Sequence, residues 1–279
     1  METILGMFDV LQAAVVKMNQ EGGYDASHPW HHALTVGEKA GLLDVEYRGE
    51  YELWFDDRST VTILEDLLCL LASPDVAPRL RTFTYRTDAV SAANGTYDYN
   101  IDPFIESDQQ FPNLTCLSLD QGQEEHGYKI LTSPLSGDDW LEAGVLARML
   151  DKARRLEELT TPVPPNSDFF SGGRHSIRSL DVDSGFGQEN FVRQLAGCTR
   201  FPELRWLVFT DYRQDHMTDW RRVTTSFEDY ILFFESATAQ RLEIIRLQEV
   251  SLSQSQIDHL LSIRSAGVTF TRFVDDGKP

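Results

Sequence analysis

Basic residues, cysteines and long apolar runs are all scarce in this sequence. The 279 residues include 25 Lys and Arg against 44 Asp and Glu, for a formal net charge of −19. That charge argues against binding to nucleic acid or anionic lipid, because both polyanions are neutralised by basic side chains. The longest apolar run, at 67–72, is far below the roughly 18 residues of a membrane-spanning helix. We therefore expect neither a nucleic-acid-binding protein nor a membrane protein.

The cysteines and the N-terminus indicate a cytoplasmic protein. Cys69, Cys116 and Cys198 are an odd number of cysteines at wide spacing, which matches neither a disulfide framework nor a CxxC metal site. The first residues lack the basic region of a signal peptide, and polar residues such as Asp9 and Lys17 interrupt their apolar positions. Reduced thiols and a cytoplasmic location are the expectation.

Sequence motifs that mark enzymes are also absent. The chain has no GxSxG elbow, no phosphate-binding GxxxxGK(S/T) loop and no HExxH. His28, His31 and His32 offer nitrogen ligands, but no further ligand at fixed spacing completes a metal site. Asp181 and Asp183 keep a carboxylate-dependent hydrolase open as an alternative. We expect a non-catalytic protein without cofactor or metal.

Apolar residues make up 41% of the chain and aromatic residues 11%, which is enough to form a packed core. Residues 1–75 predict an N-terminal α+β cap. Its expected elements are a helix over 3–18 that ends near 21–23, a hairpin of 42–47 and 51–55, and a helix from Ser59 or Thr60 to Leu71.

A phrase of the form L-x-x-L-x-L returns from residue 80 onward. Its copies begin at Leu80, Leu114, Leu156, Ile177, Leu204 and Leu242, and a weaker copy runs from Val268 to Phe273. Two copies share the lead-in Phe-Pro-x-Leu, at 111–114 and 201–204. Helical patterns are expected between copies at 140–155, 190–198, 220–236 and 254–263. The chain therefore alternates strand, loop and helix, as repeat proteins do.

Over about residues 76 to 275 this repeat resembles the leucine-rich-repeat family. The resemblance implies an α/β solenoid over 76–279, in which each unit adds one strand to a curved parallel sheet and one outer helical or irregular return. Copies start 21 to 42 residues apart, compared with about 20 to 29 in the family, and the family's Asn or Cys after the phrase is missing. These departures predict an irregular solenoid with long insertions. The alternative is an ordinary α/β domain whose strands happen to begin with leucine.

Residues between the apolar positions of each phrase are expected on the concave face, because side chains alternate across a strand. Acidic residues dominate this set, and Trp206 stands among them as the kind of large aromatic that forms interface hot spots. The alternative for Trp206 is burial under a long insertion. The residues expected to bind a partner are Asp120, Glu158, Asp181, Asp183, Trp206, Asp211 and Arg246.

The stretch 97–144 is a second acidic feature, with ten acidic residues and one base, Lys129. Such a surface steers a basic partner at a salt-sensitive rate. The alternative is a face that is simply solvated. Both acidic features predict a protein-binding module for a basic protein, such as a toxin-like effector or an enzyme. The leading hypothesis is an immunity or inhibitor protein that occludes a toxin domain, as acidic repeat inhibitors do with basic ribonucleases, and the alternative is a scaffold or regulatory subunit that recruits an enzyme.

Overall fold

The computed structural model has a mixed α/β fold with mostly parallel strands, which confirms the predicted class. It describes residues 4–26, 31–49, 59–87, 96–97, 101–121, 131–132, 142, 144–184, 190–211 and 224–272. The chain forms two compact units, which are described separately: unit 1 holds 1–141 and 148–156, and unit 2 holds 142–147 and 157–279. Within the described residues, no helix is both long enough and apolar enough to cross a membrane. The predicted boundary between 75 and 76 stays a prediction.

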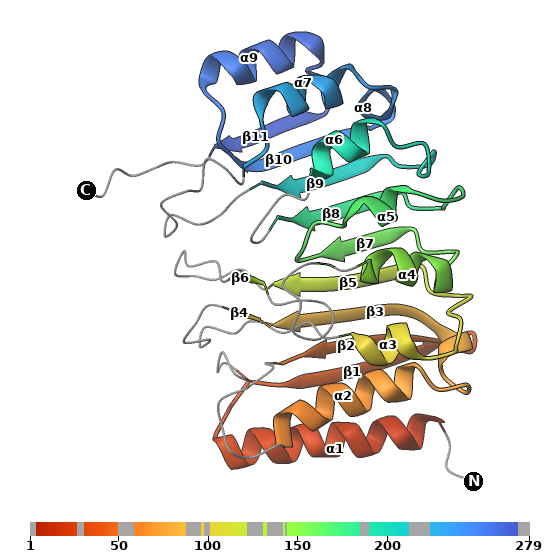
Figure 1. The fold of residues 1–279 in the computed structure, drawn as a ribbon. Coiled ribbons are helices and arrows are strands. Elements are labelled where there is room, and N and C mark those ends of the chain that lie inside the picture. The colour runs from red at the N-terminus through yellow and green to blue at the C-terminus, as the bar shows by residue number, and fades with distance from the viewer. Residues whose placement is uncertain are drawn as a thin grey trace. The chain divides into compact units, whose positions relative to one another are not determined.

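Unit 1 is built on four strands in the order β1-β2-β3-β5, and only β1 and β2 are antiparallel. Its elements are α1 (Ile4–Gly22), β1 (Ala33–Lys39), β2 (Leu42–Arg48), α2 (Ser59–Leu71), a 3-10 turn (Ala77–Arg79), β3 (Leu80–Thr87), α3 (Asp102–Glu106) and β5 (Cys116–Gln121). A separate short pair joins β4 (Thr96–Tyr97) to β6 (Leu131–Thr132). In Figure 1, α1 lies beyond β1, the edge strand of the unit 1 sheet, and α2 and α3 lie on one face of that sheet. The predicted helices α1 and α2 are confirmed.

The hairpin of unit 1 lies one strand earlier than predicted. β2 pairs with β1 through the turn Ala40-Gly41, where φ is +54° and +80°. Two positive φ values suit the right-handed twist of a hairpin, but alanine seldom adopts one. The expected pairing of 42–47 with 51–55 is wrong, because β1 and β3 occupy both edges of β2. The segment 51–55 itself lies outside the described residues.

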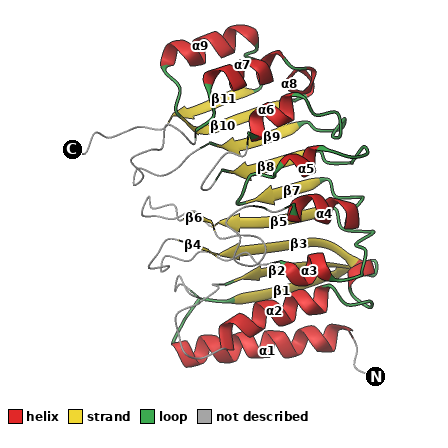
Figure 2. Cartoon of the chain, in the orientation of Figure 1, coloured by secondary structure: helices red, strands yellow, loops and turns green. Residues whose placement is uncertain are grey.

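Unit 2 contains five parallel strands in the order β7-β8-β9-β10-β11, and every connection includes a helix. Its elements are β7 (Glu158–Thr161), α5 (Ser167–Phe170), β8 (Ser179–Asp183), α6 (Phe191–Ala196), β9 (Trp206–Thr210), α7 (Phe227–Glu235), α8 (Ala237–Arg241), β10 (Ile244–Val250), α9 (Gln254–Ile263) and β11 (Val268–Arg272). Helix α4 (Val145–Lys152) belongs in part to each unit. Figure 2 shows α5 to α8 on the same face of the unit 2 strands. The predicted helices are found as α4, α6, α7 and α9.

Each copy of the repeated phrase forms a strand. In the first six copies, the residues at the three phrase positions are at most 2% exposed, and all of them except Thr161 are apolar. The first position is Leu80, Leu114, Leu156, Ile177, Leu204 and Leu242; the second is Phe83, Leu117, Leu159, Leu180, Leu207 and Ile245; the third is Tyr85, Leu119, Thr161, Val182, Phe209 and Leu247. The phrase is therefore the core-forming pattern of the chain. The last copy differs, because β11 has no buried residue.

A recurrent backbone contact starts the strands of unit 2. The carbonyl after the first apolar residue accepts two N–H groups of the next copy. Glu157 accepts from Arg178 and Ser179 at 2.7 and 3.0 Å, Arg178 accepts from Arg205 and Trp206 at 2.9 and 3.0 Å, and Arg205 accepts from Glu243 and Ile244 at 2.7 and 3.1 Å. These bonds satisfy backbone groups at the strand starts and fix the register of β7 to β10.

Basic side chains four residues before three copies of the phrase bind carbonyls where the preceding short helices end. Lys152 Nζ donates to the carbonyl of Ser107 after α3, and Arg200 Nη1 donates to the carbonyl of Phe169 in α5 at 2.8 Å. Arg264 donates to the carbonyls of Ala239 and Leu242 at the end of α8. Carbonyls at a helix C-terminus lack intrahelical donors and carry partial negative charge, so cations stabilise them. The repeat therefore includes a cation that its apolar pattern did not reveal.

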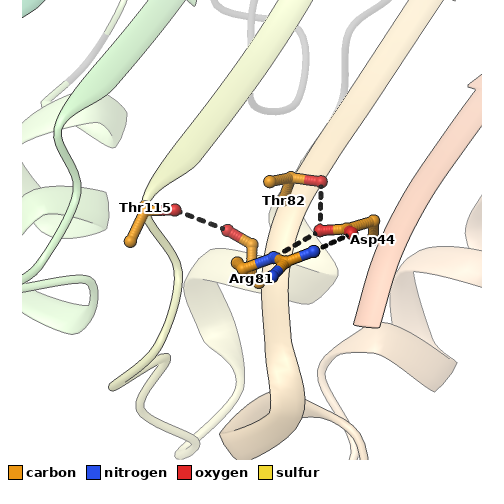
Figure 3. Close-up of polar contacts among 4 residues, drawn as sticks. All are labelled: Asp44, Arg81, Thr82 and Thr115. Carbon is orange, nitrogen blue, oxygen red and sulfur yellow. Dashed lines mark hydrogen bonds and ion pairs between the residues drawn. The ribbon is translucent and has the colours of Figure 1, made fainter. Parts of the chain in front are cut away.

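In unit 1 an ion pair joins the start of β3 to β2. The register shifts by one residue between Leu43 and Asp44, which leaves Arg81 as an extra residue. Arg81 Nε donates to Asp44 Oδ1 at 2.8 Å, Nη2 donates to Oδ2, and the Thr82 hydroxyl donates to Oδ1 at 3.0 Å (Figure 3). The carbonyl of Arg81 accepts the N–H of Thr115 at 2.8 Å. Arg81 thus links β2 and β3 to the residue that precedes β5.

The ion pair with Arg81 changes the pKa of Asp44. The Arg81 guanidinium, and to a lesser extent the Thr82 hydroxyl, lowers the pKa of Asp44, because both donate to the charged carboxylate. Arg81→Met should raise this pKa back toward the usual range, and Thr82→Val should raise it less. Carboxyl ¹³C NMR titration measures both. An Asp44 pKa that is equal in wild type and Arg81→Met would contradict the pairing.

Candidate functional site

Four strands of unit 2 place their outward side chains in rows on the face opposite the core. One row contains Glu158, Ser179, Trp206 and Ile244, and the next contains Thr160, Asp181, Val208 and Arg246. Asp183, Thr210 and Gln248 follow at the carboxyl ends of the strands. Along each strand one buried residue separates the first two rows and points to the opposite, core face: Leu159, Leu180, Leu207 and Ile245. We call the first two rows, together with Asp183, the strand face.

Trp206 is the large apolar side chain of the strand face that is exposed to solvent. It is 40% exposed, whereas the next residue, Leu207, is fully buried. Strand alternation explains the difference, because successive side chains point to opposite faces. Beside Trp206 on β8 lies Ser179, a small residue, and beside it on β10 lies Ile244. The exposure predicted for Trp206 is confirmed, and its role in binding stays a prediction.

Charges on the strand face are unevenly distributed. Glu158 on β7 is exposed, and Asp181 and Asp183 on β8 are partly buried, while the base Arg246 on β10 is exposed. The acids therefore lie to the β7 and β8 side of Trp206, and the base lies to the β10 side. Asp120 belongs to β5 of unit 1, and its side chain lies outside the described residues. The structure thus brings together five of the predicted binding residues in unit 2.

Asp211 is not on the strand face, so its predicted placement among the partner-facing residues is wrong. The residue is fully buried. Its carboxylate accepts the N–H and hydroxyl of Thr225 at 3.0 and 2.9 Å through Oδ1, and the Tyr230 hydroxyl at 3.0 Å through Oδ2. Burial raises the pKa of Asp211 to about 6, although these hydrogen bonds oppose the shift. Alternation explains the position, because Asp211 has the same parity as the core residues Leu207 and Phe209.

Most of the acidic stretch 97–144 lies outside the described residues. Of its described members, Glu106 and Asp108 are exposed. Glu142 is buried, contrary to the prediction of a surface acid. Its carboxylate accepts the N–H groups of Gly144 and Leu146 at the start of α4, and that of Asn166 at 3.1 Å. Glu142 therefore satisfies free backbone donors at a helix N-terminus.

The histidines near the N-terminus do not form a metal site in the described structure. His32 is 3% exposed, and its backbone exchanges two hydrogen bonds with the Asn19 side chain of α1. Its Nδ1 lies 3.1 Å from the Tyr47 hydroxyl, and burial lowers the pKa of His32 to about 4. His28 lies outside the described residues. Among the residues described, no three His, Cys, Asp or Glu side chains converge on a possible metal position.

The strand face combines apolar contact area with charges of both signs. An exposed indole, carboxylates on one side and a guanidinium on the other provide apolar contact area and charge contacts. The polar pair that sequence reasoning missed, Thr225 and Tyr230, has a structural role in holding Asp211. Comparison of the chain with protein-family models, with curated proteins and with solved structures finds no match.

Proposed function

We propose that this chain is a non-catalytic, irregular leucine-rich-repeat solenoid that binds a basic protein through the strand face. The proposal extends to an immunity or inhibitor protein, which occludes the active surface of a toxin domain and performs no chemistry itself. The observation that carries it is Trp206, a 40% exposed aromatic with acidic residues on the two strands to one side.

Exposed tryptophan is a strong indicator of binding. Large aromatic side chains provide much contact area for little loss of conformational freedom, and tryptophan is enriched among residues that dominate binding energy. A strand whose neighbouring residues Leu207 and Phe209 are fully buried holds Trp206 on a rigid support. A binding residue on a rigid element loses less entropy when the complex forms.

Charge supports a basic partner over an acidic one. The whole chain has a net charge of −19. Glu158 and Asp181 add local negative charge on the β7 and β8 side of Trp206, and Asp183 lies farther along β8. Such a field accelerates encounter with a basic protein and disfavours like-charged partners. An occluding inhibitor needs both a central anchor and this long-range attraction.

A capture experiment with matched variants tests the proposal. Immobilised wild-type protein is expected to retain a basic protein from native lysate at low salt, and the pair is then rebuilt from purified components. Trp206→Ala should weaken this binary complex by about 30-fold or more, the effect expected of a hot-spot residue. Leu232→Ala is the control, because Leu232 is also exposed, at 45%, but lies on helix α7.

Salt dependence provides the second measurement. Glu158→Gln and Asp181→Asn should lower the association rate and reduce its dependence on ionic strength, because exposed charges steer the encounter. A binary complex whose affinity is the same in wild type and Trp206→Ala would contradict the proposed face. Retention of acidic proteins alone would contradict the proposed partner class.

The second candidate function is a scaffold or regulatory subunit that recruits an enzyme through apolar contacts. It is favoured by exposed apolar residues on α1, where Leu5, Val10 and Val16 are 44%, 62% and 53% exposed. A complex formed through α1 should respond little to salt and should weaken in Val10→Ser and Val16→Ser rather than in Trp206→Ala.

A further inference from the structure

We propose that the strand face contains a subsite for one arginine side chain of the partner, located above Ser179 and bounded by Trp206, Glu158 and Asp181. This inference rests on the proposed function and deepens it, because it names the chemical group that the acidic side of Trp206 recognises. The bound group is a guanidinium, stacked on the indole and paired with the two carboxylates.

The register of the strands defines the position. Ser179 lies directly between Glu158 on β7 and Trp206 on β9, in one row across the sheet. Neighbouring strands are about 4.8 Å apart, so Glu158 and Trp206 flank Ser179 at about that spacing. Asp181 is two residues farther along β8 on the same face, about 6.6 Å away at the rise of a strand.

Ser179 has a small side chain, so on β8 it occupies little of the space beside Trp206. Serine ends at its hydroxyl, whereas the residue on the other side of Trp206 is Ile244, a branched apolar side chain. A cation binds an aromatic face when it lies within about 6 Å of the ring centroid. A cation above Ser179 would lie about one strand spacing, 4.8 Å, from both Trp206 and Glu158, which is within this range, and Glu158 is exposed.

Arg246 restricts the cation to this side. It is exposed and lies two residues beyond Ile244 on β10, diagonal to Trp206. A second cation on the β10 side would meet this like charge, whereas on the β8 side it meets Glu158 and Asp181. The strand face is therefore negatively charged on the β8 side of Trp206 and positively charged on the β10 side. A partner binds with its arginine above β8 and any acidic residue above β10.

Arginine fits this subsite better than lysine does. The guanidinium is planar, so it stacks on an indole while its edge donates to a carboxylate. An ammonium is a compact, strongly hydrated charge that cannot do both with the same geometry. The subsite therefore predicts a preference for arginine over lysine, and for either over a neutral isostere.

Small amides test the subsite without the partner. The protein is labelled with 5-fluorotryptophan, which gives five fluorine signals for its five tryptophans, and Trp206→Phe assigns the signal of Trp206. L-Argininamide should shift this signal saturably while the four other signals stay fixed. L-Lysinamide should bind about two- to fivefold more weakly, the size of an exposed cation–aromatic contact. L-Citrullinamide, whose side chain is neutral while its α-amino group matches that of the other two amides, should give no saturable shift.

Variants of the same protein locate the bound cation. Glu158→Gln and Asp181→Asn should each weaken argininamide binding about two- to fivefold, the effect of removing one exposed charge contact. Glu235→Gln is the matched control, because Glu235 is an exposed acid on the helix side of the same unit. Ser179→Arg should shift the Trp206 signal without ligand and abolish the response, because the substituted side chain fills the subsite. Circular dichroism checks that each variant keeps the wild-type fold.

Failure of this subsite is distinguishable from failure of the proposed function. A Trp206 signal that does not move with argininamide, or moves together with all the others, overturns the subsite even when a basic protein is captured through Trp206. Equal responses to argininamide and citrullinamide overturn it as well. A saturable, arginine-selective shift of the Trp206 signal supports the subsite, even when no basic protein is captured and the proposed function is contradicted.

Discussion

Asp211→Ala is expected to lower the free energy of unfolding by about 2–4 kcal/mol at pH 7. The loss leaves the Thr225 N–H and the Tyr230 hydroxyl without their acceptor in the core. A buried donor without an acceptor costs about 1–3 kcal/mol, and relief of the buried charge offsets part of the total. Asp211→Asn retains an acceptor and removes the charge, so we expect its stability at pH 7 to lie within about 1 kcal/mol of wild type.

The pH dependence follows from the same carboxyl. Its pKa is about 6 in the folded protein, against an ordinary value of 3.8, because burial disfavours the charged form. Between these values the unfolded chain has released the proton and the folded chain still holds it. Unfolding therefore releases a proton, and Asp211 makes the protein less stable as the pH rises from about 4 to about 6. Over about two pKa units this amounts to roughly 3 kcal/mol.

Urea denaturation across this pH range measures both effects. The difference in unfolding free energy between wild type and Asp211→Asn isolates Asp211 from the many other acidic groups, because they are common to both proteins. The difference should change in favour of wild type as the pH falls from 6 to 4. A constant difference would contradict the elevated pKa, and an Asp211→Ala protein as stable as wild type would contradict the buried hydrogen bonds.

The strands could be predicted from the sequence because their physical cause is local. Three apolar positions in six residues are the minimum pattern that buries one face of a short parallel strand against neighbouring copies. Leu204, Leu207 and Phe209 illustrate the pattern, since each is at most 1% exposed. The exposure of Trp206 follows from the same alternation.

The errors arose where position depends on tertiary contacts. Strand parity alone would have placed Asp211 in the core, but an acid is rarely buried, and its partners Thr225 and Tyr230 follow an insertion that the phrase does not predict. The turn at Ala40 could not be predicted from the sequence, because the residues that usually indicate a positive φ are glycine and asparagine. Glu142 looked like a surface acid for the same reason that Asp211 did.

The basic residue four positions before the phrase was visible in the sequence but had no interpretation there. Lys152, Arg200 and Arg264 share that spacing from Leu156, Leu204 and Val268. Their role depends on short helices of the preceding copy, which are too brief for periodicity to reveal: α3, α5 and α8 have five, four and five residues. A fixed spacing between a base and the phrase is the signal that would have found them.

Arg200→Met tests this role where the cation is most buried. Arg200 is 4% exposed, and its guanidinium donates to the carbonyl of Phe169 at 2.8 Å. Methionine fills similar apolar volume but offers no donor, so this carbonyl at the end of α5 loses its partner. We expect the free energy of unfolding to fall by about 2–4 kcal/mol, the range for a lost hydrogen bond to a charged group plus the buried acceptor left behind.

The matched control is Arg193→Met, the same chemical change on helix α6 of unit 2. Arg193 is 64% exposed on its side chain, and its Nε lies 3.5 Å from Oδ1 of Asp229, whose side chain is 13% exposed. An ion pair with one solvent-exposed partner contributes about 0–1 kcal/mol. Urea denaturation at pH 7 should therefore separate the two variants clearly, with Arg200→Met unfolding at much lower urea concentration. Equal midpoints would mean that the guanidinium of Arg200 does not stabilise the end of α5, and the cation would then be no part of the repeat's physical pattern.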